Sequence, residues 1–131
     1  MLDLNQILRF FPEHVQDDTK SLIREYLQCK ILNLIFQSKI ANKLIFIGGT
    51  ALRIVYDIQR FSEDLDFDNK DLTLDDWIEL GDVIKRGLAK EGIEVDIAKT
   101  RLNDTVFHHN LRFPGIFFQY KIWLSPRILN N

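Results

Sequence analysis

Near the middle of the chain, the hydrophobic period of the sequence changes twice within one short stretch, which limits the possible folds more than any other feature. The apolar run Leu44–Ile47 predicts a strand buried on both faces. Gly48 and Gly49 end this strand, and from Thr50 onward apolar residues recur at helical spacing. In the segment 64–68, acidic and apolar residues alternate, as in a strand with one buried face. The stretch therefore predicts a strand, a glycine turn, a helix and a second strand.

The sequence on both sides of this stretch predicts further helices and strands. Apolar residues at helical spacing predict one helix over Thr19–Lys39. A second helix is expected to begin after Thr73, which has the form of an N-cap with an acid three residues later, and to close at Gly92. Strands are expected over 93–97, 105–113 and 116–124. This order predicts an α+β fold in which helices flank a mixed β-sheet.

The length and composition of the chain fit one folded domain spanning residues 1–131. Of the 131 residues, 46% are hydrophobic and 27% are charged, close to the usual globular mixture. The net charge of −2 argues against a broadly basic surface for nucleic acid. The first residues lack the basic flank and apolar run of a secretion signal, and no apolar run approaches the ~18 residues of a membrane span. We therefore expect a cytoplasmic protein without a membrane partner.

Three carboxylates are expected to share one face of the second strand. Leu65 and Phe67 would point into the core, which places Asp64, Asp66 and Asp68 on the opposite side. Like charges at this spacing repel each other unless a cation lies between them. Magnesium prefers carboxylate oxygens and fills its remaining positions with water and substrate phosphates. An Asp-x-Asp pattern can also be an ordinary solvated face, so this feature alone leaves both interpretations open.

The sequence Gly48-Gly49-Thr50, at the start of the helix expected from Thr50, is a candidate phosphate site. Backbone N–H groups at a helix start can bind phosphate oxygens, and glycine permits the closest approach. If this turn and the acidic strand meet at one rim, amides would bind phosphates beside carboxylates that bind metal. A tight turn without a ligand is the alternative interpretation of the same residues.

The two features together resemble the signature of a known family. The run Phe46–Arg53, followed by Arg60–Phe67, resembles the motifs of the nucleotidyltransferase AbiEii/AbiGii toxin family in residue order and spacing. The resemblance covers about Leu44–Asp68 well and the rest of the chain loosely. It implies the polymerase-β-like nucleotidyltransferase fold. In the toxin–antitoxin members it also implies a type IV toxin that acts on nucleotides and is opposed by a separately encoded antitoxin.

The resemblance also implies roles for individual residues. Asp64 and Asp66 would be the catalytic pair and would hold Mg2+. The residues implied in nucleotide binding are Gly48, Gly49 and Thr50 for the triphosphate, with Arg60 and Ser62 bordering the site.

The C-terminal part departs from the family pattern. Such enzymes usually add a third carboxylate and a lysine from a later strand, followed by a helical domain, whereas this chain stops at Asn130-Asn131. We therefore expect a fragment or a shortened gene product that lacks the helical domain and part of its site. Asp96 could supply the missing carboxylate if its strand is adjacent, and Lys121 could meet a phosphate. Asp96 is better explained as a solvated surface acid, and Lys121 is equally well explained as an exposed lysine on an ordinary strand.

Other reactive residues are predicted to be structural. His108 and His109 have no partner at metal-ligand spacing, which argues against zinc. Cys29 lies within an amphipathic helix and, as the only cysteine, cannot form an internal disulfide. Trp77 is most simply a core residue.

The sequence and the resemblance together thus predict a magnesium-dependent nucleotidyltransferase that moves a nucleotide from a nucleoside triphosphate to an unknown acceptor, which could be RNA or protein. It would be the toxin of a type IV, abortive-infection system with a cognate antitoxin. One alternative is a truncated, inactive protein of the same fold that acts through nucleotide or protein binding. A second is a module whose acidic face docks a basic partner without metal.

Overall fold

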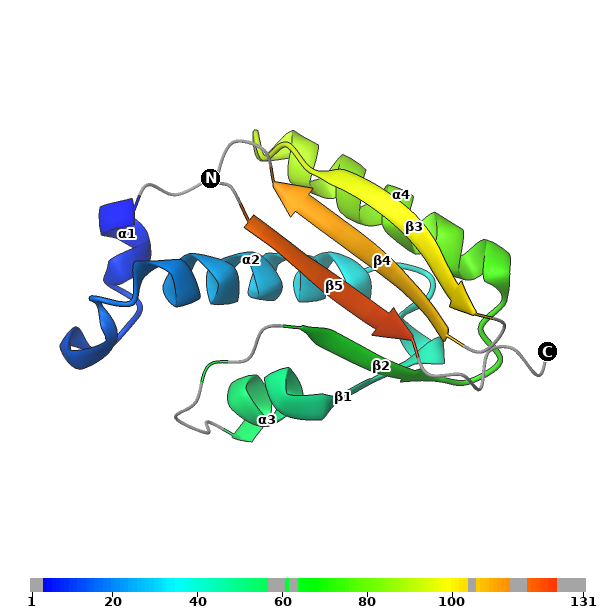
Figure 1. Cartoon of the computed structure of the whole chain (residues 1–131), viewed down its shortest axis with the longest axis horizontal. Helices are drawn as coiled ribbons and strands as arrows, with labels where there is room; N and C mark the ends of the chain where they lie inside the picture. The colour runs from blue at the N-terminus through cyan, green and yellow to red at the C-terminus, as the bar shows by residue number, and fades with distance from the viewer. Residues whose placement is uncertain (1–3, 57–60, 62–63, 104–105, 114–117, 125–131) are drawn as a thin grey trace.

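The computed structural model describes residues 4–56, 61, 64–103, 106–113 and 118–124. Helices and strands follow one another in the predicted order (Figure 1). The helices are α1 Leu4–Leu8, α2 Thr19–Phe36, α3 Gly48–Tyr56 and α4 Leu74–Lys90, with short 3-10 turns at Glu13–Val15 and Ala41–Lys43. The strands are β1 Leu44–Ile47, β2 Leu65–Asn69, β3 Asp96–Asn103, β4 Val106–Phe113 and β5 Phe118–Leu124.

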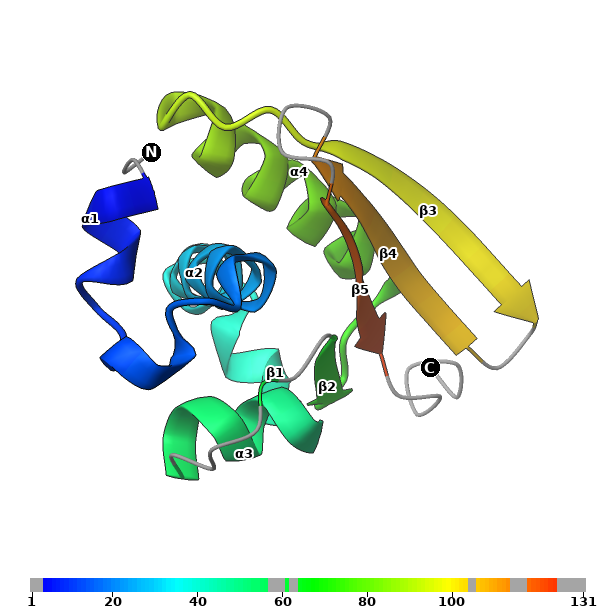
Figure 2. The same cartoon turned by 60° about the vertical axis from the view of Figure 1, so that its left-hand side comes forward.

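The five strands form one mixed sheet in the order β1-β2-β5-β4-β3. β2 and β5 are parallel, and the other neighbours are antiparallel. Helices α2 and α4 lie on the same side of this sheet (Figure 2). The predicted α+β class and mixed sheet are therefore confirmed.

The core fills the space between this helical layer and the sheet. Helix α2 contributes Leu27 and Ile31, and β2 contributes Leu65 and Phe67, all at most 1% exposed. Trp77 of α4 belongs to the same core, as predicted, and its ring stacks on His109 of β4 at 4.3 Å. His109 is fully buried, and its Nε2 lies 2.7 Å from the Trp77 carbonyl oxygen. This histidine is therefore part of the core packing.

The boundaries of α4 explain why one predicted strand begins late. Thr73 and Asp76 form the capping box, in which each side chain accepts a hydrogen bond from the other's backbone N–H. At the other end Gly92 adopts φ +75°, and the Ile93 N–H donates to the Leu88 carbonyl at 3.0 Å. Because this helix cap uses the backbone of Ile93, the strand expected over 93–97 is wrong in its start. β3 begins at Asp96.

Three other expectations about elements need correction. β1 was expected to be buried on both faces, but it is an edge strand, and Ile45 and Ile47 are 39% and 41% exposed. The reason is that α2 and α4 cover only one side of the sheet. Helix α2 ends at Phe36, before Lys39, and α3 starts at Gly48 itself, before Thr50. The expected start of the last strand, at residue 116, lies outside the described residues.

Candidate active site

The acidic strand has the two faces that its alternation predicts. Leu65 and Phe67 are fully buried against the helical layer, while Asp64, Asp66 and Asp68 are half-buried. β2 itself begins at Leu65, so Asp64 immediately precedes the strand. Since side chains alternate along a strand, the carboxylates lie on the side that α2 and α4 leave uncovered.

The glycine turn and the acidic strand meet at one rim, as predicted. Ile47, the last residue of β1, pairs with Asp66, so the start of α3 comes directly beside this carboxylate. Gly48 has φ +84°, and a Cβ atom built there would lie 2.5 Å from Asp66 Oδ2. Only glycine accommodates both the backbone conformation and the contact. The helix start and the metal-binding candidates are therefore in direct contact.

Residues Gly48, Gly49 and Thr50 form the first turn of α3, whose N–H groups have no acceptor within the helix. The positive end of the helix dipole lies at the same place. The Thr50 side chain is fully buried, and its hydroxyl donates a hydrogen bond to the backbone carbonyl of Asp64. Thr50 thus ties the helix start to the residue that opens the acidic strand.

The electrostatics of the pair favour a cation. Burial raises the pKa of Asp66, and the negative charge of Asp64 raises it further. Both effects penalise the ionised form of Asp66 in the folded protein. A cation between the two carboxylates would oppose both, which gives the pair the chemistry of a metal site.

This shift predicts a pH-dependent gain of stability on replacement of Asp66. Because the folded state keeps the Asp66 proton to a higher pH than the unfolded state, wild-type stability falls as pH rises from the ordinary aspartate pKa of about 3.9 through the raised value. Asp66→Asn removes this loss. In urea unfolding without metal, the variant should match wild type in acid and become more stable than it at neutral pH. A difference independent of pH would contradict the assignment.

A buried ion pair fixes α3 to α2. Arg53 Nε lies 2.6 Å from Glu25 Oε1, and Nη2 lies 3.3 Å from Oε2. The two side chains are only 15% and 11% exposed. The Arg53 guanidinium also lies 4.5 Å from the centre of the Phe61 ring, in the segment that leads toward Asp64. Helix α3 is therefore held at its start by Thr50 and farther along by Arg53.

Sequence reasoning gave Arg53 no role and overlooked Glu25. A signal was present: Glu25 lies three residues after Leu22 and three before Gln28 on α2, and all three are buried. An acidic side chain on a buried helix face requires a partner.

The other acidic candidates, Asp68 and Asp96, each have a partner of their own. Asp68 shares the face, but its Oδ1 accepts a hydrogen bond from the Asn69 N–H at 2.8 Å. In the described part of the chain, no three His, Cys, Asp or Glu residues form a group that could hold a metal. Asp96 cannot replace the third carboxylate, because β5 and β4 separate its strand from β2, and it pairs with Arg112 at 3.5 Å.

Two of the sequence-predicted residues, Arg60 and Ser62, lie outside the described residues. Lys121 lies on β5, two residues before Trp123, which pairs with Asp66. The register thus brings the backbone of this strand beside the acidic strand.

The architecture is similar to that of two solved structures. A candidate nucleotidyltransferase from H. pylori matches with a TM-score of 0.62 and 27% identity, covering 82% of this chain and 46% of its own. The protein JHP933 from Helicobacter pylori matches in fold, with a TM-score of 0.58 and 24% identity over 81% of this chain and 44% of its own. This chain therefore spans less than half the length of either. No curated protein shows a significant match.

The fold is that of a nucleotidyltransferase domain. Residues 30–130 match the family described as "Nucleotidyl transferase AbiEii toxin, Type IV TA system". The chain belongs to this family, which confirms the resemblance found in the sequence.

Across the described residues, no helix is long and apolar enough to cross a membrane.

Proposed function

We propose that this chain forms the catalytic half of a magnesium-dependent nucleotidyltransferase that acts as a type IV toxin. The observation that carries the proposal is the contact between Gly48 and Asp66, where a Cβ atom would lie 2.5 Å from the carboxylate. At this point the start of α3 lies beside Asp66, and the first N–H groups of a helix have no acceptor within that helix. That combination suits a triphosphate bound together with its metal.

The residues present fit magnesium. This ion is commonly bound by one or two carboxylates, with substrate phosphates and water completing its octahedron, and Asp64 and Asp66 would supply the two. When bound, it would neutralise charge on the α-phosphate and on the departing pyrophosphate. The N–H groups of Gly48, Gly49 and Thr50 would bind and orient the triphosphate. An acceptor hydroxyl of RNA or protein would then attack the α-phosphorus, and pyrophosphate would leave.

The family supports further parts of the proposal. Membership of a type IV toxin–antitoxin family supports a cognate antitoxin. The proposal places the site of action in the cytoplasm. Arg60 and Ser62 would border the bound nucleotide, in line with the family motif. Specificity for the nucleotide base and for the acceptor would depend on residues other than those named above.

A second candidate is an inactive member of the family that retains nucleotide binding. The absence of a third metal-ligating side chain from the described residues favours it, because catalysis of this type ordinarily uses one more carboxylate to activate the acceptor. Both candidates would bind a nucleotide at the same site, and only the active enzyme would transfer it to an acceptor.

The test is calorimetric titration with each of the four ribonucleoside triphosphates, with and without magnesium. We expect binding that requires magnesium and weakens at least about tenfold in Asp64→Asn, because one of two charged ligands is lost. Asp68→Asn, on the same face, is the control and should bind as wild type. Binding that is indifferent to magnesium or to Asp64 would refute the site. Incorporation of α-phosphate label into cellular RNA or protein would then separate the active enzyme from the inactive one.

A further inference from the structure

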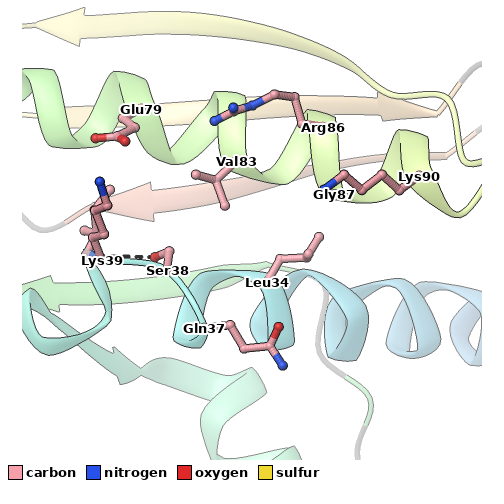
Figure 3. Close-up of a pocket in the computed structure, with 10 residues that line it drawn as sticks. Leu34, Gln37, Ser38, Lys39, Glu79, Val83, Arg86, Gly87 and Lys90 are labelled. Atoms are coloured by element: carbon pink, nitrogen blue, oxygen red, sulfur yellow. Dashed lines mark hydrogen bonds between the residues drawn. The ribbon is translucent and has the colours of Figure 1, made fainter.

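A groove between α2 and α4, on the outside of the helical layer, is not used by the proposed site. It has a volume of about 630 Å³ and is shown in Figure 3. Its apolar surface comes from Leu34 and Ile40 on one side and Val83 on the other. A Cβ atom at Gly87 would overlap the Leu34 side chain, so this glycine allows α2 and α4 to approach closely at the bottom of the groove.

The rim of the groove is mainly basic. Lys39, Arg86 and Lys90 line it, together with the single acid Glu79. All four residues are exposed. None of the ion pairs among the described residues uses one of the three cations. The groove therefore carries a local positive charge on a chain whose net charge is −2.

From this combination we infer that the groove binds an acidic amphipathic helix of a partner protein. An apolar floor between two helices accepts the apolar stripe of a third helix, in the usual helix-in-groove mode. The unpaired cations complement Asp or Glu residues that flank such a stripe, and this charge match selects the partner.

The same surface is poorly suited to nucleic acid. Single-stranded nucleic acid is bound by aromatic stacking platforms along a basic groove, and none of the described lining residues is aromatic. Glu79 at the rim would also repel a phosphate backbone.

Occupation of the groove leaves the candidate active site open. The groove lies on the helical layer, between α2 and α4 (Figure 3). Asp64 and Asp66 lie instead on the side of the sheet that these helices leave uncovered. A partner held here would thus be anchored to the protein without blocking nucleotide entry.

The test uses a phage-displayed library of random 16-residue peptides, selected on the wild-type chain. We expect enriched peptides to carry apolar residues at helical spacing flanked by Asp or Glu. A synthetic copy of an enriched peptide should bind at least tenfold more weakly to Arg86→Glu and to Val83→Ser. Lys85→Glu makes the same charge change on the same helix outside the groove and should change affinity less than twofold.

Three results would overturn the inference. One is that no acidic peptide is enriched, or that enriched peptides bind Arg86→Glu and wild type equally. The second is Arg86-dependent binding of a 20-nucleotide poly(U) RNA in place of peptide, which would mark a nucleic-acid surface. The third is self-association in sedimentation that Arg86→Glu abolishes, which would assign the groove to a second copy of the chain.

Discussion

Replacing Gly48 with alanine is expected to abolish most nucleotide binding while leaving the protein folded. The new Cβ would displace Asp66 or the start of α3, because it would lie 2.5 Å from Asp66 Oδ2. A displacement of about 1 Å at a reacting site can lower the rate about 100-fold, so we expect a loss of that order in nucleotidyl transfer. Magnesium-dependent nucleotide affinity, measured by calorimetry, should fall at least about tenfold in parallel.

Gly92→Ala is the matched control for this change. Gly92 has a similar φ of +75°, but no atom lies within 4 Å of the position that its Cβ would occupy. Both variants should lose about 1–2 kcal/mol of stability from the left-handed backbone conformation. Only Gly48→Ala should lose nucleotide binding. Equal effects of the two variants on binding would show that the contact with Asp66 is unimportant.

Breaking the ion pair between Arg53 and Glu25 is expected to have the largest effect on stability. Arg53→Met leaves a carboxylate that is only 11% exposed without this arginine, and Glu25→Leu removes the carboxylate that lies beside the guanidinium. Removing one member of a buried pair costs about 3–5 kcal/mol, a large part of the stability of a typical domain. Urea unfolding should therefore show a strongly lowered midpoint for either single variant.

Two further variants make this result interpretable. Arg112→Met removes an arginine from an exposed pair, whose side chains are 61% and 50% exposed, and should cost at most about 1 kcal/mol. The double variant Glu25→Leu/Arg53→Met removes both charges of this pair and should recover much of the lost stability. A double variant no more stable than Arg53→Met would mean that packing, not charge, explains the loss.

The local elements were largely predictable, because they depend on nearby residues. The alternation of Leu65 and Phe67 with aspartates predicted the two faces of β2, and Thr73 predicted the start of α4. Strand order was not predictable from periodicity, since no local pattern says that β5 lies between β2 and β4. For this reason β1 was expected to be buried on both faces, and Asp96 was allowed to be close to Asp66.

The meeting of the glycine turn with the acidic strand could be predicted from the sequence, but the ion pair that holds α3 in place could not. Glycine at position 48 and carboxylates at 64 and 66 could be matched by a family motif, and the structure places Gly48 against Asp66. Glu25 lies 28 residues before Arg53, and long-range pairs of this kind leave only a weak trace in the sequence.

The parallel pairing of β2 with β5 also determines when the protein acquires its site during folding. On one side β2 pairs with β1, which is close to it in sequence. On the other side it pairs with β5, which is far away in sequence, so that Leu65 lies opposite Ile122. Contacts over such sequence separations form slowly, because the intervening chain must first lose its conformational freedom. We therefore expect the acidic strand to be among the last parts to become rigid during synthesis. The nucleotide site proposed above would then be completed only after β5 has been made.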